Sequence, residues 1–287
     1  MMFKRGMVLF AALVFGLGAI VAGCGDIVAE DELELGMVAW ACAEAQTHVS
    51  QAVLEDELGY SVNVTTLEPA AVYSATAEGD LDFYVAAWLP VTHADYMDEY
   101  GDVLTEHNAN FEGARIGLVV PEYVDIDSIE ELNDYADEFG GQITGIDAGA
   151  GIMRATEDAE DAYGMDDMEL LESSDIAMTA ALDDAIGANE WIVVTGWTPH
   201  WKFAEYDLKF LEDPQGIYGE EEYIAAVSRP GLTETRPDVA YFLDNFFMTD
   251  DQLGDVMGRI AEGEEPIDAA RAWIEENPDV VSEWIDQ

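Results

Sequence analysis

The sequence predicts an α/β fold of two units, each a mostly parallel sheet with helices on both faces. Apolar runs of strand length alternate with runs of helical periodicity along most of the chain. This alternation is typical of parallel sheets with crossover helices. No internal repeat or low-complexity linker divides the chain. We expect a ligand site between the two units, at the carboxyl ends of their strands.

The first unit opens with alternating strands and helices. Residues 33–40 form an apolar run of strand length, and 44–59 place apolar residues at helical spacing and stop at a glycine. Residues 60–68 alternate with a period of two, which indicates a strand. A helix at 69–80 and a third strand at 81–90, ended by a proline, complete this part.

A second unit begins with a predicted strand at 114–124. A helix follows at 126–141, with Ser128 as its N-cap, and then a strand at 141–147. The remaining predicted elements are helices at 149–164 and 174–190, a strand at 191–197, and C-terminal helices at 237–247, 251–263 and 266–277.

This order implies that the second unit interrupts the first. We expect residues 33–117 and 209–287 to form one lobe and residues 118–208 the other. Residues 1–23 are predicted to be a signal peptide, and 24–32 an acidic tether.

The N-terminal segment is typical of a lipoprotein signal. Lys4 and Arg5 precede an uncharged run over residues 7–23, and small residues close it. The sequence "VAGC" at 21–24 has the form of a lipobox, after which Cys24 would be the lipidated N-terminus. Ordinary secretion, with Cys24 inside the hydrophobic region, is the alternative. Two acyl chains give stable anchoring, so we expect the protein outside the cytoplasmic membrane and tethered to its outer face.

The charge of the chain is extreme. It has 62 acidic and 10 basic residues, and removal of Lys4 and Arg5 with the signal leaves 54 net negative charges on the mature chain. Plentiful apolar residues argue against disorder, so a diffuse acidic coat indicates adaptation to high salt, where screening reduces self-repulsion. Nucleic acid is a poor partner for such a surface.

Cys42 is the other cysteine, so acylation of Cys24 would leave no disulfide.

Three tryptophans end predicted strands: Trp40, Trp88 and Trp197. The last two lie in similar segments, "AAWLPVTH" (86–93) and "VTGWTPHW" (194–201), in which tryptophan is followed by proline and histidine. Without other information, a tryptophan at a strand end is more often a packing residue than a ligand contact. We interpret Trp191, Trp201, Trp273 and Trp284 in that way.

The motifs "WACAEAQTHV", "DLDFYVAAWLPVTH", "GIDAGAGIMRATEDA", "VVTGWTPHWKFAEYDLKFLEDP" and "VSRPG" resemble one known family. They are similar to the substrate-binding lipoproteins of glycine betaine ABC transporters, the OpuAC-type members of the quaternary-ammonium-binding family. The resemblance runs from about Leu35 to Asn277. It implies a two-lobed periplasmic-binding-protein fold, type II-like, that closes on its ligand and serves osmoprotection, with an ABC permease and an ATPase as partners.

The resemblance also assigns roles to residues. It implies that Trp40, Trp88 and Trp197 surround the trimethylammonium group of glycine betaine. It further implies that the carboxylate receives main-chain N–H groups of Gly151 and Ile152 and the side chain of His93. For His200 the family pattern gives no contact, so we interpret it as a supporting or lobe-to-lobe residue. Cys42 departs from the polar or acidic residue often found near that position in relatives that bind other amines.

The chemistry of the residues agrees with this assignment. A quaternary ammonium has no N–H group, so aromatic faces must recognise it through cation–π attraction, about 0.5–2 kcal/mol each. "GAGIM" at 149–153 begins a predicted helix, whose free N–H groups favour an anion. A tryptophan cage of this kind also tolerates choline, carnitine or proline betaine.

Two other classes of protein remain as alternatives. "ITGIDAGAGIMRA" has the strand, glycine-rich turn and helix of a nucleotide-binding enzyme, but Arg154 replaces the third glycine and no strand-end acid follows about 20 residues on. An acidic surface protein would explain the charge but not the tryptophans. We expect no catalytic residues, no cofactor and no metal site, because the four histidines lack paired metal-binding spacing.

Overall fold

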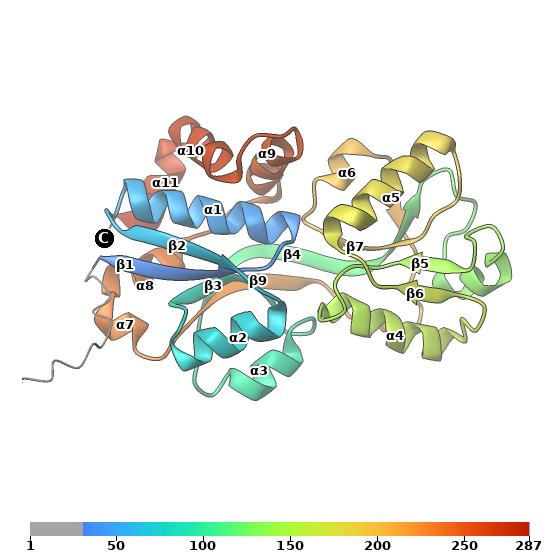
Figure 1. Ribbon diagram of the computed structural model, residues 1–287, viewed down its shortest axis with the longest axis horizontal. Coiled ribbons are helices and arrows are strands. Elements are labelled where there is room, and N and C mark those ends of the chain that lie inside the picture. Colours follow the sequence, from blue (N-terminus) through green and yellow to red (C-terminus); the bar gives the residue numbers. More distant parts are fainter. Residues whose placement is uncertain (1–30, 287) are drawn as a thin grey trace, which may run out of the picture. The chain divides into compact units, whose positions relative to one another are not determined.

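The computed structural model describes residues 31–286. The predicted signal peptide and Cys24 lie outside the described residues. Within residues 31–286, no helix combines the length and the apolar character that a membrane span requires. The predicted α/β class is confirmed: helices surround a sheet whose strands gather in two groups, which Figure 1 shows side by side.

One group of strands, with its helices, is called here the β1–β3 half. Strands β1 (Glu32–Met37), β2 (Ser61–Thr66) and β3 (Phe83–Leu89) run parallel, and β1 lies between the other two. Its helices are α1 (Ala41–Asp56), α2 (Pro69–Glu78), α3 (Ala94–Tyr100), α7 (Leu232–Thr235), α8 (Pro237–Asn245), α9 (Asp250–Ala261), α10 (Pro266–Glu276) and α11 (Pro278–Ile285).

The other group is called the β5–β7 half. Strand β5 (Gln142–Thr144) pairs in parallel with β6 (Glu169–Leu171) and with β7 (Val194–Thr198). Its helical elements and its short additional strand are η1 (Ile129–Tyr135), α4 (Gly151–Tyr163), α5 (Asp175–Ala188), α6 (Lys202–Glu205) and β8 (Leu208–Phe210).

Strands β4 (Thr105–Pro121) and β9 (Glu222–Ser228) carry the chain between the halves, and β4 is much the longer. Strand β4 pairs antiparallel with β9 over its first part and with β7 and β8 over its last part. Strand β9 is also antiparallel to β3. The sheet is therefore mixed, because the two connecting strands run against their parallel neighbours.

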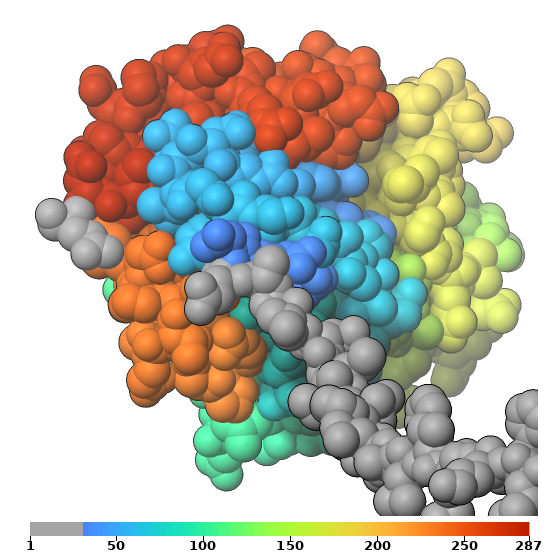
Figure 2. Space-filling model, turned by 60° about the vertical axis from the view of Figure 1, so that its left-hand side comes forward, coloured from blue at the N-terminus to red at the C-terminus, as the bar shows by residue number. Residues whose placement is uncertain are grey.

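The C-terminal helices cover one face of the β1–β3 half. Figure 2 shows them lying against α1, and helices α9 and α10 both pack on it. Their buried faces carry large rings: Trp273 stacks on Trp284, with ring centres 5.9 Å apart. Both tryptophans are buried. The prediction that they serve packing agrees with these contacts.

Several elements differ from the sequence prediction. Strand β4 begins nine residues before the predicted start at 114, and the predicted helix at 126–141 is a shorter 3₁₀ helix, η1. Ser128 caps η1 as expected, in a capping box with Glu131. Strands β6, β8 and β9 and helices α3, α6, α7 and α11 were not predicted. The lobe boundaries at 117/118 and 208/209 stay a prediction; β4 spans the first, and β8 begins at the second.

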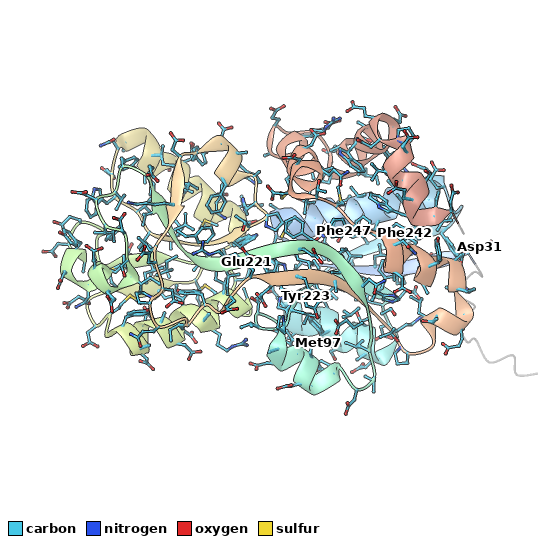
Figure 3. The ribbon with its side chains drawn as sticks, turned by 180° about the vertical axis from the view of Figure 1, so that it is seen from behind. Asp31, Met97, Glu221, Tyr223, Phe242 and Phe247 are labelled. Atoms are coloured by element: carbon cyan, nitrogen blue, oxygen red, sulfur yellow. The ribbon has the colours of Figure 1, made fainter. Side chains whose placement is uncertain are left out.

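Acidic side chains lie almost entirely outside the core. Of the acids within residues 31–286, only Asp175 and Glu222 are buried. Figure 3 shows the side chains around the ribbon. Because burial of an unpaired carboxylate is costly, these two exceptions indicate sites where the structure supplies partners for the charge.

Candidate functional site

A small cavity lies between the two halves. Its space not filled by atoms is about 290 Å³, open solvent included. None of its lining residues is charged. They are Trp40, Trp88, Thr92, Ile116, Ile146, Ala150, Gly151, Ile152 and Trp197.

All three predicted cage tryptophans therefore line one cavity. Trp40 is the N-cap residue of α1, just after β1, whereas Trp88 and Trp197 are each the next-to-last residue of a buried strand. In both of those strands the following proline has a cis peptide bond, at Leu89-Pro90 and Thr198-Pro199. Trp197 lies more than a hundred residues after the other two in the chain, and all three are at least 94% buried.

The first turn of α4 forms another wall of the cavity. Gly151 and Ile152 are its first two residues, so their N–H groups have no partner within the helix. A Cβ atom on Gly151 would lie 2.1 Å from the carbonyl oxygen of Thr92. Only glycine therefore permits this approach between the β5–β7 half and the loop after β3.

His93 lies behind the cavity wall. It is fully buried, and the N–H of Trp88 donates to its Nδ1 at 3.0 Å. Nδ1 is thus the acceptor, and the ring proton belongs on Nε2. Within the described residues Nε2 is buried without a hydrogen-bond partner. Burial, with a smaller effect from the charge of Arg154, lowers the pKa of His93 to about 3, so the ring is neutral at ordinary pH.

Polar contacts join the halves around the cavity. The indole N–H of Trp40 donates to Asp147 Oδ2 at 3.2 Å, and the hydroxyl of Tyr96 donates to the carbonyl of Gly149 at 2.9 Å. Arg154 of α4 donates to the carbonyl of Thr92 at 3.3 Å and forms an ion pair with Asp95 at 2.7 Å. Asp147 and Tyr96 were not predicted to support the site.

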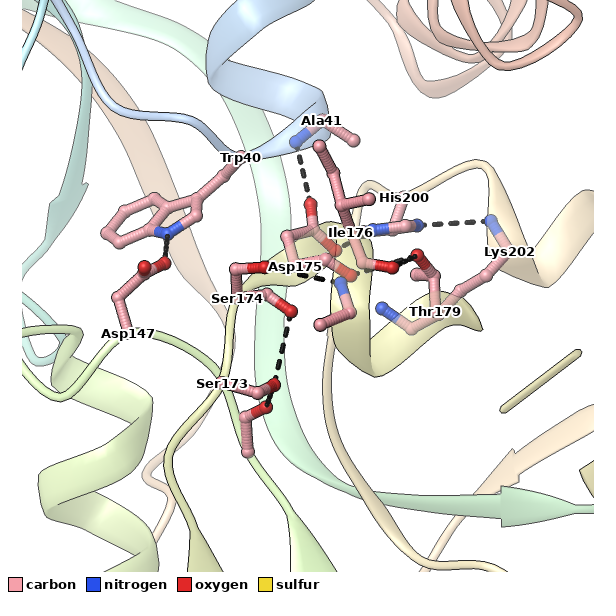
Figure 4. A network of polar contacts seen from close by, with 12 residues as sticks. Trp40, Ala41, Asp147, Ser173, Ser174, Asp175, Ile176, Thr179, His200 and Lys202 are labelled. Carbon is pink, nitrogen blue, oxygen red and sulfur yellow. Dashed lines mark hydrogen bonds and ion pairs between the residues drawn. The ribbon is translucent and has the colours of Figure 1, made fainter. Parts of the chain in front are cut away.

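A buried acid, Asp175, is the first residue of α5 and makes a further contact between the halves. Its Oδ2 accepts from the N–H of Ala41 at 2.9 Å, and its Oδ1 accepts from His200 Nε2 at 3.0 Å. Figure 4 shows this network beside Trp40. The N–H of Lys202 donates to His200 Nδ1 at 3.1 Å, which places the histidine proton on Nε2. Burial alone would raise the pKa of Asp175, but the hydrogen bond from His200, the charge of Lys202 and the bond from Ala41 hold that pKa below its usual value.

The second buried acid, Glu222, holds the loop after β3. Its carboxylate accepts from the N–H groups of Val91 and Thr92, at 2.7 and 2.8 Å, and from the Thr92 hydroxyl. Figure 3 labels Glu221 and Tyr223, the neighbours of Glu222, where β4 and β9 pass between the halves. Glu222 thereby positions Thr92 in the cavity wall. Nothing in the surrounding sequence "GEEEYI" distinguished it from its acidic neighbours.

Cys42 and Lys202 are buried near the cavity without lining it. Burial raises the pKa of the Cys42 thiol to about 12, so it is a small neutral group. Burial lowers the pKa of Lys202 to about 7. Within the described residues, the ammonium nitrogen has no hydrogen-bond partner, and it lies over the ring of Trp197.

The described residues contain no group of three or more His, Cys, Asp or Glu side chains placed to hold a metal ion.

Trp191 packs against Tyr135 and Phe139, away from the cavity. Trp201 packs on His200, with ring centres 5.4 Å apart. These arrangements agree with the packing roles predicted for both tryptophans.

Comparison with known proteins identifies a family. Residues 31–276 match OpuAC, described as the substrate binding domain of ABC-type glycine betaine transport systems. The chain is 47% identical, over 155 residues, to the glycine betaine/carnitine transport binding protein GbuC of Listeria monocytogenes. That match covers 53% of this chain and 52% of GbuC, so it spans about half the length of the relative.

Two solved structures share the fold. Lactococcal OpuAC, in a closed-liganded conformation complexed with glycine betaine, has a TM-score of 0.85 and 37% identity, covering 89% of this chain and 100% of that one. The glycine/betaine/L-proline-binding protein ProX of Borrelia burgdorferi has a TM-score of 0.85 and 36% identity, covering 89% and 97%. These neighbours are two-lobed periplasmic binding proteins, so the predicted fold type is confirmed.

Proposed function

The chain belongs to the OpuAC family of substrate binding domains of ABC-type glycine betaine transport systems, and on that premise we propose that its tryptophan-lined cavity binds glycine betaine for import. One observation carries the proposal: Trp40, Trp88 and Trp197 meet at a cavity that also holds the first turn of a helix. Aromatic faces suit a cation without N–H groups, and a helix N-terminus suits an anion. Glycine betaine has both ends in one small molecule.

The trimethylammonium group binds among the three indole rings. Each ring contributes about 0.5–2 kcal/mol of cation–π attraction, more where water is excluded. The absence of charged side chains among the lining residues supports this mode over an ion pair. Hydrated Na⁺ and K⁺ are rejected because entry would remove their water shells. That selectivity matters for a protein that collects its ligand from concentrated salt.

The carboxylate binds at the start of α4. Gly151 and Ile152 donate their N–H groups, and the positive end of the helix dipole favours the negative charge. His93 donates from Nε2, which is the nitrogen of its ring that has no hydrogen-bond partner among the described residues. A neutral histidine with its proton on Nε2 makes this donation without adding a charge that depends on pH.

Related amines are the alternative ligands. Carnitine and proline betaine have both a quaternary ammonium and a carboxylate, whereas choline lacks the carboxylate. The cage would accept all three, so the order of affinity depends on the carboxylate site and on the size of the cavity. A dinucleotide is far larger than glycine betaine, and none of the residues that line the cavity is charged, which disfavours an enzyme that uses the "GAGIM" turn.

The protein would deliver its ligand to an ABC permease and an ATPase from outside the cytoplasmic membrane. Lipidation of Cys24, in "VAGC" at 21–24, would hold it to the outer face of that membrane. The net charge of −52 on the full chain and the near-exclusion of acids from the core suit a medium of high salt. We infer that this protein works as an osmoprotectant receptor in such a medium.

Calorimetric titration tests the proposed function. The protein without its signal peptide is titrated with glycine betaine, proline betaine, carnitine and choline at molar KCl, with NAD as a negative control. We expect glycine betaine to bind and NAD to give no heat. Failure of every quaternary amine to bind would rule out the proposal.

A further inference from the structure

We propose that Asp175 is a positioning residue of the binding site, a buried latch that ties Trp40 to Trp197 by joining the start of α1 to His200. The inference rests on the proposed function, since it concerns the two rings that would enclose the ligand cation. His200, which the family pattern left without a contact, is part of this latch.

The latch lies between the two halves of the molecule. Ala41, next to Trp40, is the first residue of α1 in the β1–β3 half. Asp175 begins α5 in the β5–β7 half, and His200 lies three residues after Trp197 in the same half. The carboxylate of Asp175 therefore fixes the backbone beside one cage ring relative to the strand end that holds another. Figure 4 shows the carboxylate between Ala41 and His200.

Helix α1 lacks the usual side-chain cap. Its N-cap residue is Trp40, which has extended backbone angles and makes no side-chain capping bond. The carboxylate of Asp175 takes the place of that cap by accepting from Ala41, 134 positions earlier in the chain. A carboxylate between the starts of two helices is favoured by both helix dipoles. The capping bond exists only when the two halves are together, so it selects the closed arrangement.

Both side-chain oxygens at position 175 must accept a hydrogen bond. Ala41 offers an N–H group, and His200 offers Nε2–H because its Nδ1 already accepts from Lys202. An asparagine would present an NH₂ group to one of these two donors. With Asp175 only 4% exposed, water could not relieve that conflict, so Asp175→Asn removes the latch while keeping the shape of the side chain.

The ion pair that joins the halves is more accessible to solvent. The side chains of Arg154 and Asp95 are 42% and 65% exposed, and exposed ion pairs contribute little. His200 packs edge-on to Trp197, with ring centres 4.9 Å apart, so a shift of His200 also moves a cage ring. The latch therefore affects the position of the Trp197 ring, through His200, as well as the contact between the two halves.

The experiment compares Asp175→Asn with Asp82→Asn. Asp82 also accepts from a backbone N–H and a basic side chain, Glu34 and Arg229, each at 2.8 Å, but both partners lie in the β1–β3 half. Stopped-flow tryptophan fluorescence gives association and dissociation rates for glycine betaine, and thermal unfolding gives stability. We expect Asp175→Asn to raise the dissociation rate about tenfold or more, with an association rate within about twofold of wild type. Asp82→Asn should change stability without changing dissociation.

A second pair of variants distinguishes loss of the hydrogen bond from a general loss of folding. His200→Ala removes the donor, whereas His200→Gln keeps an N–H donor near the position of Nε2. We expect faster dissociation in His200→Ala and partial rescue in His200→Gln. Equal dissociation rates for wild type and Asp175→Asn, or equal increases in Asp175→Asn and Asp82→Asn, would overturn the latch.

A measurement on the ligand-free protein tests the latch separately from the proposed binding of glycine betaine. Amide hydrogen exchange at Ala41 should be slow in wild type and faster in Asp175→Asn. Unchanged exchange at Ala41 would count against the latch, whatever the protein binds. A wild-type protein that bound no quaternary amine would refute the proposed function, and the exchange comparison would still decide the latch.

Discussion

The ammonium nitrogen of Lys202 lies 4.1 Å from the centre of the Trp197 ring. Lys202 is fully buried and does not line the cavity, so the ring turns its other face or its edge to the cavity. A cation on one face draws electron density from the ring and weakens its attraction for a second cation. In the proposed cage, the attraction of the Trp197 ring for a ligand cation would therefore depend on the charge of Lys202.

Lys202→Met should bind glycine betaine about two- to fivefold more tightly than wild type at pH 7, because it removes the competing cation and keeps the length of the side chain. Since burial lowers the pKa of Lys202 to about 7, wild type should gain affinity as the pH rises from 6 to 8 and the lysine loses its proton. Calorimetry at both pH values measures this. A pH dependence of equal size in Lys202→Met would contradict the explanation.

Trp88→Ala and Trp197→Ala should each weaken glycine betaine binding by about tenfold or more, since each removes one desolvated aromatic face. Trp191→Ala is the matched control, because Trp191 is partly exposed and packs on Tyr135 and Phe139, away from the cavity. Equilibrium titration of the three variants at molar KCl is the measurement. Wild-type affinity in both cage variants would refute the three-ring cage.

His93→Ala should reduce affinity for glycine betaine more than affinity for choline, because choline has no carboxylate to receive the Nε2–H group. With the pKa of His93 lowered to about 3 by burial, the difference should persist unchanged from pH 5 to pH 8. Titration with both ligands at two pH values checks it. Equal losses for the two ligands would place His93 outside the carboxylate site.

Gly151→Ala should abolish measurable glycine betaine binding, since the added methyl group would meet the Thr92 carbonyl at 2.1 Å and hold the halves apart. Gly149→Ala is the control in the same turn, because its nearest neighbour would be a Pro69 atom at 3.8 Å. Calorimetry measures binding, and thermal unfolding verifies that both variants fold. Normal binding by Gly151→Ala would mean that the contact with Thr92 does not form in the bound state.

The unfolding temperature should rise by several degrees between 0.1 and 2 M KCl, because salt at about 1 M screens charges beyond about 3 Å. The net charge of −52 on the full chain makes self-repulsion the main electrostatic term. Thermal unfolding in KCl is compared with sucrose at equal osmolality, which changes water activity without screening. A flat response to KCl would argue against adaptation to high salt.

The residues of the cavity could be predicted from sequence because they lie in the motifs that resemble the family, and that resemblance brought them together at one site. Trp88 and Trp197 end apolar runs, and Gly151 opens a helix after a strand, so local pattern placed each at a strand or helix end. The alternation of strands and helices likewise gave the α/β class. The start of β4 was missed because residues 105–113 include "HNAN", which lacks the apolar alternation of a strand.

The support for the cavity could not be predicted in the same way. Asp175 bonds a backbone N–H 134 positions earlier in the chain, and a backbone donor leaves no trace in the sequence. Glu222 stands in "GEEEYI", where three adjacent acids look alike and only the register of β9 buries one of them. The supporting roles of Asp175 and Glu222 can be recognised only after the helices and strands have been placed in three dimensions.

Glu222 also begins β9, opposite Ala114 of β4, at the point where the chain crosses between the halves. The same carboxylate holds the backbone of Val91 and Thr92. A change in the angle between the halves at this crossing would therefore move Thr92 in the cavity wall, because the side chain of Glu222 connects the two places. If the halves separate at this crossing, Glu222 is the side chain that would carry the movement to Thr92 in the cavity wall.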